Sequence, residues 1–503
     1  MGRRIRWLGL GMLLCFSLVL VQLVNVQYVK APALRASAYN PRNASQKYNN
    51  QRGNIYAADG TLLAHSVRAI SGSYLYTRQY PQGSLYSQVV GYASTFYGTA
   101  GVEYQYNNQL VAHTQNAQDF SQVLGLDPIP KVLDNLTLTI DPTLQQAAAT
   151  ALAQIPGGNT DAAVVAINPT TGAVLADYST PTFDPNALAA PDTVAGTAEQ
   201  KAAGIADFKV PDHEGFFAGL PLATADIFPP GSTFKVVTTA AVYNLMPNLA
   251  DFNFPEATST PLPNSDKPLT NDGNEPCGGS IAQMLPQSCD PGYGLLGIAL
   301  GAPTLAKQAA LFGYNSTPPI DLPKSWVATP SFPPVSSLEP PNQSLLAYSA
   351  IGQFNVRASA LSNALVAAGI ANGGVILTPH VVAQIRDSQG NVVQSMQPQV
   401  WMQATSQAAA AQTTALMKLV VTQGTASGVG FSPALDAAVK TGTGQTGNSA
   451  QNTDDWMIGF APANDPKIAV AVLVPLQAVS ATGATVAGPI MKAMLDAALL
   501  PSG

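Results

Sequence analysis

The chain has 503 residues, of which 46% are hydrophobic and only 10% are charged, and its formal net charge is −6. This length exceeds one ordinary core, so two or three domains are expected, and the apolar content excludes a disordered protein. Nothing in the charge resembles the basic footprint of a nucleic-acid binder, so no nucleic-acid partner is expected.

The N-terminal segment combines positive charge with a long apolar run. Three arginines among the first six residues precede residues 7–29, which carry no charge. Such a run can span a bilayer as a helix, and the arginines place the N-terminus in the cytoplasm. We therefore predict a cytoplasmic tail over 1–6, a single transmembrane helix over 7–29, and an extracytoplasmic remainder. The alternative is a signal peptide cleaved within 31–38, but the apolar run is longer than a typical signal requires.

Residues 30–155 are predicted to form an N-terminal, β-rich pedestal. An Asp59-Gly60 turn between two short apolar runs predicts a β-hairpin. Residues 136–140 alternate with the period of a strand. Asp141 is a suitable cap for an Ala-rich helix over 144–155.

Residues 156–503 are predicted to form an α+β domain with a mainly antiparallel sheet, because strands occur at both ends of the region and helices between them. The predicted strands cover 163–167, 173–176, 437–441, 456–460 and 468–474, and the predicted helices follow Ser232 and cover 281–285, 293–300, 358–371 and 485–499.

The cysteines agree with export of most of the chain. Cys15 lies in the predicted membrane span, whereas Cys277 and Cys289 lie in the exported part. An oxidising compartment permits a disulfide between these two, and a pair of free thiols is the alternative. The three cysteines and four histidines show no zinc-type spacing, so we expect no metal.

The first candidate catalytic motif is Ser232-Thr233-Phe234-Lys235, which begins an apolar helix. Residues three apart share a helix face, so Lys235 stacks beside Ser232. A serine hydroxyl needs a base to become a nucleophile, and a lysine can serve when burial or a second cation lowers its pKa. Alone the motif is weak, since most instances are a helix cap followed by an exposed lysine.

Two further motifs could complete such a site. Lys440-Thr441-Gly442-Thr443 ends an apolar strand and offers a second cation, two hydroxyls and a glycine that permits close approach of a substrate backbone. Ser288-Cys289-Asp290 lies between two predicted helices and could present Ser288 to Ser232. Each also has an ordinary interpretation: an edge strand with a solvated lysine, and a surface turn whose aspartate caps a helix.

Together and in this order, the three motifs resemble the Ser-x-x-Lys, Ser-x-Asn and Lys-Thr-Gly set of the penicillin-binding transpeptidases and serine β-lactamases. Further motifs extend the resemblance to class B penicillin-binding proteins, and within them to the short PbpA-like proteins of actinobacteria. These motifs cover 51–60, 101–110, 352–354, 371–374, 424–426, 456–462 and 487–490. The resemblance implies a penicillin-binding/serine β-lactamase-like transpeptidase domain over 156–503 and a pedestal or dimerisation-like domain before it.

The resemblance also implies a role for each matching residue. Ser232 attacks the D-Ala-D-Ala carbonyl of a peptidoglycan stem peptide, Lys235 accepts its proton, and Ser288 relays a proton to the leaving amine. The substrate-binding set is Asp290, Lys440, Thr441, Gly442 and Thr443, and the N–H groups of Ser232 and Thr443 form the oxyanion hole. An amine of a second stem peptide then resolves the acyl-enzyme. The implied function is D,D-transpeptidation, with covalent inhibition by penicillin and other β-lactams.

One position departs from the family pattern. Asp290 stands where the family usually has asparagine. An ionised aspartate cannot donate a hydrogen bond, and it favours protonated Lys235, which opposes the role of a general base. Asp290 is therefore held neutral, or points away, or lowers activity.

Two other functions are considered beside an active transpeptidase. A non-enzymatic scaffold would have lost activity through Asp290, and a penicillin hydrolase or β-lactam sensor would share the same motifs. No metal or organic cofactor is implied. The resemblance implies a membrane glycosyltransferase of the SEDS family as a partner, together with other elongation or division proteins.

Overall fold

The computed structural model describes residues 2–26, 30, 51–68, 75–94, 97–114, 131–155, 161–189, 219–446, 452–478 and 480–501. The N-terminal segment forms helix α1 (Gly2–Val24). Its stretch Arg6–Val24 is long and apolar enough to cross a membrane, and none of it is buried. The helix begins before the predicted span because arginine is itself a good helix former. Residues 27–29 of that span lie outside the described residues.

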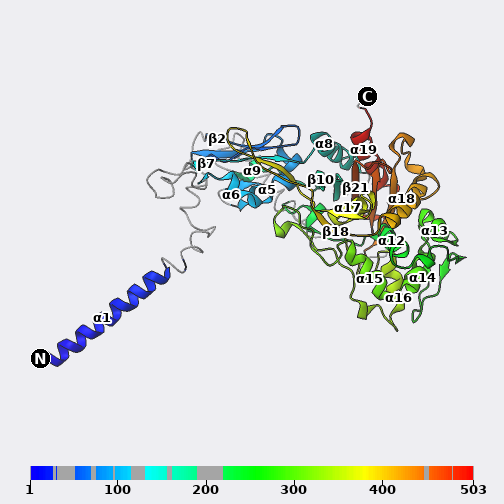
Figure 1. Cartoon of the computed structure of the whole chain (residues 1–503), viewed down its shortest axis with the longest axis horizontal. Coiled ribbons are helices and arrows are strands. Elements are labelled where there is room, and N and C mark those ends of the chain that lie inside the picture. Colours follow the sequence, from blue (N-terminus) through cyan, green and yellow to red (C-terminus); the bar gives the residue numbers. More distant parts are fainter. Residues whose placement is uncertain are drawn as a thin grey trace.

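A six-stranded sheet forms the pedestal, which lies beside the larger domain in Figure 1. The Asp59-Gly60 hairpin is confirmed, since β1 and β2 pair antiparallel around it. Gly60 has φ +90°, a conformation that suits glycine. In sheet order the strands are β17 (Val392–Ser395), β16 (Val382–Arg386), β8 (Asn135–Leu138), β1 (Ile55–Tyr56), β2 (Leu62–Arg68) and β3 (Tyr76–Gln79).

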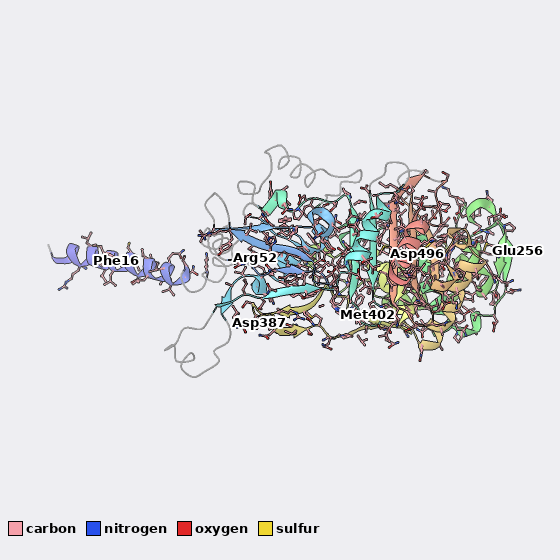
Figure 2. All side chains as sticks on the ribbon, turned by 90° about the horizontal axis from the view of Figure 1, so that it is seen from above. Phe16, Arg52, Glu256, Asp387, Met402 and Asp496 are labelled. Carbon is pink, nitrogen blue, oxygen red and sulfur yellow. A yellow bond between two sulfur atoms is a disulfide. The ribbon has the colours of Figure 1, made fainter. Side chains whose placement is uncertain are left out.

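The pedestal is not continuous in sequence. Strands β16 and β17 come from the region predicted to belong wholly to the second domain, and β16 pairs antiparallel with β8. Asp321 ties the regions together: its carboxylate accepts bonds from the backbone N–H groups of Val381 (2.6 Å) and Val382 (3.1 Å) and from the Tyr106 hydroxyl (2.7 Å). Figure 2 shows Arg52 and Asp387, which are far apart in the sequence, at this same end of the molecule.

Helix α8 (Pro142–Leu152) lies before the predicted boundary at residue 155 but packs with the second domain. Asp141 caps it as expected, accepting bonds from Thr143 N and Leu144 N. Its apolar residues, however, pack in one core with α19 (Ala487–Leu499) and the second sheet. The buried face of this helix therefore has its packing partner in the second domain.

The second domain is built on a five-stranded antiparallel sheet, as predicted. Its strands in order are β10 (Val174–Thr180), β9 (Ala162–Ile167), β21 (Ile468–Ala478), β20 (Asn452–Ala461) and β19 (Ala438–Gln445). All residues of β9 are buried, since helices cover both faces of the sheet. Strand β19 lies at the edge, so it offers a backbone to which another extended chain can add.

Helices enclose this sheet in two layers (Figure 1). Helices α8 and α19 pack on one face, whereas α17 (Ala360–Ala371) packs on the other. The predicted helices are confirmed with small shifts at their ends. The other longer helices are α12 (Lys235–Leu245), α13 (Ile281–Gln287), α14 (Asp290–Leu300), α15 (Ala302–Leu311), α16 (Gln343–Ala350) and α18 (Gln407–Thr422).

The remaining elements are short. Those of the first region are η2 (Gly83–Tyr86), α4 (Ser87–Val90), β4 (Ala93–Ser94), β5 (Gly98–Thr99), α5 (Gly101–Gln105), α6 (Asn107–Leu110), β6 (His113–Thr114) and β7 (Lys131–Val132). Those of the second include α9 (Asn186–Ala189), α11 (Leu222–Ala225), η3 (Gly231–Phe234), β11 (Phe254–Ala257), β12 (Ser259–Thr260), β13 (Leu269–Thr270), η5 (Asp272–Asn274), β14 (Cys277–Gly279), β15 (Val375–Leu377) and β18 (Val400–Gln403).

Candidate active site

Ser232 lies in η3, a 3₁₀ turn that runs directly into α12. A 3₁₀ helix has three residues per turn, so positions 232 and 235 lie one above the other. Ser232 is half-buried and lines the cavity of this site, whereas Lys235 is fully buried. The predicted stacking of the two residues is therefore present, although in a tighter helix than expected.

Two glycines bring this turn against the edge strand β19. Gly231 has φ +51°, and a Cβ there would lie 2.4 Å from the carbonyl oxygen of Thr443. A Cβ on Gly442 would lie 2.7 Å from a side-chain carbon of Thr233. The space beside Gly442 is thus occupied by the protein itself. The sequence predicted that Gly442 lets a substrate backbone come close. In the structure, Gly442 lets the turn that carries Ser232 pack closely against β19.

Lys235 uses its ammonium group within the protein. Its Nζ donates to the Ser288 carbonyl oxygen at 2.6 Å, to Asp290 Oδ1 at 2.5 Å and to Ser288 Oγ at 3.3 Å. It also lies 5.4 Å from the centre of the Tyr293 ring. Asp290 therefore does not point away from Lys235, and one of the three alternatives for this residue is excluded.

Ser288 joins the two lysines. Lys440 Nζ donates to Ser288 Oγ at 2.8 Å and to the Thr441 carbonyl oxygen at 2.9 Å. Ser288 Oγ therefore accepts from both Lys235 and Lys440. The three motifs, which are far apart in the sequence, meet at this one hydroxyl.

Burial governs the charges of the two lysines. It lowers the pKa of Lys235, while the neighbouring Asp290 and Asp272 oppose this. Burial and the adjacent Lys235 together hold the pKa of Lys440 well below its ordinary value, with Asp290 again opposing. Two ammonium groups this close in a dry environment favour loss of one proton, which is the condition for a lysine base.

The loop that presents Ser288 is fixed from several sides. Ser288 ends α13 in a left-handed conformation, with φ +57°. Asn271 Oδ1 accepts a bond from the Asp290 N–H at 3.1 Å, and Cys277 and Cys289 are joined by a disulfide. Both contacts tie the loop to the segment 269–279.

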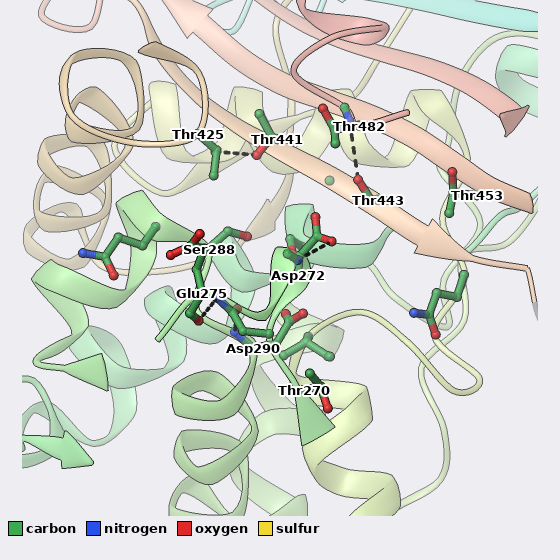
Figure 3. Close-up of a pocket in the computed structure, with 18 of the residues that line it drawn as sticks. Thr270, Asp272, Glu275, Ser288, Asp290, Thr425, Thr441, Thr443, Thr453 and Thr482 are labelled. Carbon is green, nitrogen blue, oxygen red and sulfur yellow. Dashed lines mark hydrogen bonds between the residues drawn. The ribbon is translucent and has the colours of Figure 1, made fainter. Parts of the chain in front are cut away.

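A cavity of about 600 Å³ opens above Ser232, within the usual range for a ligand site. In Figure 3, Thr425, Thr441 and Thr443 lie on one side, and Ser288 and Asp290 face them. Thr425 Oγ1 and Thr441 Oγ1 are 2.6 Å apart. Threonine hydroxyls of β19 and of the turn at Thr425 therefore face the Ser288 loop across the cavity.

Several residues of this cavity had no role predicted from the sequence. Asp272 and Glu275 form part of its wall, and Asn271 positions the loop. Nothing in the local pattern of 269–275 marked it as part of a site. Gln353 and Thr425 lay in motifs that carry the family resemblance, which was the available signal. Across the described residues, no group of three or more His, Cys, Asp or Glu side chains could hold a metal ion.

The fold and site define a penicillin-binding transpeptidase: an antiparallel sheet between helices, with a serine–lysine turn packed on an edge strand that carries a second lysine. The sequence matches "Penicillin binding protein transpeptidase domain" over residues 162–496 and "Penicillin binding protein A dimerisation domain" over residues 52–126. The chain belongs to the penicillin-binding proteins, in class B, and is PbpA-like.

Relatives and solved structures agree with this assignment. Peptidoglycan D,D-transpeptidase PbpA of Mycolicibacterium smegmatis is 34% identical over 99% of both chains. The structure of penicillin-binding protein A from M. tuberculosis as a penicillin G acyl-enzyme complex has 32% identity and a TM-score of 0.76, covering 90% of this chain and 100% of that chain. The ceftriaxone acyl-enzyme complex of the same protein has 33% identity and a TM-score of 0.77, covering 90% and 99%.

Proposed function

We propose that this protein is a peptidoglycan D,D-transpeptidase that cross-links stem peptides through an acyl-serine and is acylated by penicillin. One observation carries the proposal: Ser232 lines the cavity one 3₁₀ turn from the buried Lys235. On the facing loop, the Ser288 hydroxyl accepts bonds from Lys235 and from the second buried lysine, Lys440. A nucleophile, a candidate base and a proton relay therefore lie together.

In the acylation step, Ser232 Oγ attacks the carbonyl carbon of the D-Ala-D-Ala bond while Lys235 accepts its proton. The backbone N–H groups of Ser232 and Thr443 receive the developing oxyanion. The tetrahedral intermediate collapses, the bond to the terminal D-Ala breaks, and the leaving amine takes a proton through Ser288. This role fits Ser288 because its hydroxyl contacts both lysines.

The terminal carboxylate of the substrate is held at β19. Thr441 and Thr443 line the cavity, and the buried Lys440 donates to the Thr441 carbonyl oxygen behind them. Penicillin carries an equivalent carboxylate and an acylating carbonyl, so it would occupy the same positions. An amine from a second stem peptide then attacks the acyl-enzyme and restores Ser232.

The membrane arrangement completes the proposal. Helix α1 fits a single-pass anchor of a penicillin-binding protein. The arginines before its apolar stretch favour a cytoplasmic N-terminus and an extracytoplasmic catalytic domain. We propose a cytoplasmic tail over 1–6, a transmembrane helix over 7–29, a pedestal over 30–155 and a transpeptidase domain over 156–503. Strands β16 and β17 belong to the last range but pair in the pedestal sheet. A SEDS-family glycosyltransferase and other elongation or division proteins are the proposed partners.

Labelling with a fluorescent penicillin tests the function. Wild-type protein should become covalently labelled, and Ser232→Ala should not. Ser325→Ala is a matched control, because Ser325 is an exposed serine that follows a lysine and lies outside the cavity. Absence of labelling in folded wild-type protein would contradict the proposal.

The 2.5 Å contact of Lys235 with Asp290 favours a second candidate, a scaffold whose lysine is held protonated. This candidate predicts that Ser232→Ala supports growth as well as wild type when it replaces the chromosomal copy. A transpeptidase predicts loss of growth or of cross-links. Quantifying cross-linked muropeptides in the two strains separates them.

A further inference from the structure

Asp455 is a buried residue on the strand next to β19, the strand proposed to bind the substrate. It lies on β20, where it pairs with Thr443 of β19. Its exposed fraction is 0%. Among the described residues, neither of its carboxyl oxygens has a hydrogen bond of ordinary geometry, although the Thr443 hydroxyl is close enough to lower its pKa. A buried carboxyl group without a well-formed hydrogen bond destabilises the folded protein. A hydroxyl group beside it is therefore a favourable hydrogen-bond partner.

That hydroxyl belongs to Thr443. Directly opposite residues of an antiparallel pair project from the same face of a sheet, so Asp455 and Thr443 lie side by side. Thr443 Oγ1 accepts a bond from Gly483 N at 3.4 Å, and Thr443 also lines the cavity (Figure 3). Its single hydroxyl proton can therefore be directed either to a ligand in the cavity or to Asp455.

The surroundings keep Asp455 close to the point of titration. Burial raises its pKa to about 7, the Thr443 side chain opposes this, and the Asp454 and Asp272 carboxylates raise it further. On the neighbouring strands its partners are the uncharged Thr443 and Val474. The segment 480–486, which covers this face through Gly483, contains no titratable side chain.

We propose that Asp455 is a positioning residue that acts through Thr443 and decides whether the Thr443 hydroxyl donates to the carboxylate of the substrate. The inference rests on the proposed function and deepens it, because it assigns a control of carboxylate recognition to a residue outside the three motifs.

Two states of the pair follow. With Asp455 protonated, its O–H donates to Thr443 Oγ1, and the Thr443 proton is available to the ligand. With Asp455 ionised, the buried charge draws the Thr443 proton to itself, and the proton is no longer available to the ligand. Recognition of a carboxylate should therefore weaken as Asp455 ionises.

The test is the second-order rate constant of acylation by penicillin G, measured at about pH 6 and about pH 8. Asp455→Asn keeps a donor beside Thr443 and cannot ionise. The ratio of Asp455→Asn to wild type should be close to one at the lower pH and about three- to tenfold at the higher pH, the effect of one hydrogen bond. Asp465→Asn is the matched control, since Asp465 is an exposed aspartate that pairs with Lys467, and its ratio should not change with pH.

Thr443→Val tests the route of the effect. In this background the pH-dependent part of the Asp455→Asn ratio should disappear. A ratio that is equal at both pH values, or that persists without the Thr443 hydroxyl, would overturn the inference while leaving the proposed function intact. Wild-type protein that is not acylated at any pH would overturn the proposed function and the inference with it.

The unmodified protein supplies a second measurement if Asp455→Asn does not fold. Penicillin G and its methyl ester differ in the carboxylate that Thr443 would bind. The ratio of their acylation rate constants should fall by about three- to tenfold between about pH 6 and about pH 8. An unchanged ratio would contradict the inference.

Discussion

Within the part of the chain that the structure describes, we compare two buried charge clusters, one in each domain, each of which combines one carboxylate with two cations. In the pedestal, Glu103 is fully buried and receives bonds from Arg52 Nη2 and Arg78 Nε, each at 2.6 Å. In the transpeptidase domain, Asp290 accepts from Lys235 beside the second lysine, Lys440. Of the two, the second cluster borders the cavity above Ser232.

The two clusters differ in what their cations can do. Burial alone would raise the pKa of Glu103, but Arg78 and Arg52 outweigh it and lower that pKa. A guanidinium group cannot lose its proton in a protein, so these charges are permanent. Lysine pKa values respond to burial, and both Lys235 and Lys440 are shifted toward the neutral form. The type of cation therefore separates a cluster of fixed charges from one in which the charges can change.

The largest expected effect comes from replacing Lys235 by arginine, whose side chain cannot lose its proton. Lys235→Arg keeps the charge but removes a base, so penicillin acylation should fall by at least ~10³-fold, within the usual contribution of a general base. Stopped-flow measurement of acylation checks this. Lys418→Arg is the control, because Lys418 pairs with Asp436 at the surface and its substitution should leave the rate unchanged. A Lys235→Arg rate close to that of wild type would remove Lys235 from the role of base.

Breaking the pedestal cluster should affect stability and not chemistry. Glu103→Gln leaves two buried guanidinium groups without their counter-charge, which typically costs about 3–5 kcal/mol. Chemical denaturation should show this loss, whereas the acylation rate of the folded fraction should equal that of wild type. Asp436→Asn breaks an exposed pair and should cost less than about 1 kcal/mol. Equal losses for the two variants would show that the pedestal cluster contributes no more than a surface pair.

Asp290→Asn tests how strongly the Asp290 carboxylate controls the pKa of Lys235. Asp290 raises the pKa of Lys235, so its removal should let the free base form at lower pH. The acidic limb of the acylation profile should therefore move to lower pH. The rate near pH 6 should rise by up to about tenfold if the pKa of Lys235 falls by about one. A limb that stays in place would show that Asp290 does not control Lys235.

The smallest effect concerns Asp177, a buried carboxyl group whose pKa is affected by no cation among the described residues. Burial raises its pKa to about 7, and within the described residues neither of its oxygens has a hydrogen-bond partner. The folded state then holds a proton that the unfolded state has lost, so stability falls as pH rises from about 4 to about 7.

Asp177→Asn should remove this dependence and stabilise the protein by about 1 kcal/mol near pH 8, the scale of one unsatisfied buried group. Thermal unfolding of both proteins across this pH range checks it. The exposed Asp465 provides Asp465→Asn as a control without effect. A parallel pH dependence in wild type and Asp177→Asn would contradict the assignment.

Local patterns in the sequence predicted most of the elements and the class of protein. The apolar run of α1, the period-two strands and the Asp141 cap depend on residues close together in the chain, so they can be read directly. The family resemblance could also be read directly from the sequence, because it depends on the order of short motifs along the chain. The disulfide between Cys277 and Cys289 was left open by the sequence, and the structure joins the two cysteines at the loop that carries Ser288.

Only the tertiary structure decided how distant segments pair. It placed β16 and β17 in the pedestal and α8 in the second domain, because a strand edge or an apolar helix face is completed by whichever partner lies next to it in space. It turned Asp290 toward Lys235 and set Asp455 behind Thr443. The sequence by itself determined which groups are available for chemistry. Their charge states depend on burial and on neighbours supplied by other segments, and these exist only in the folded protein.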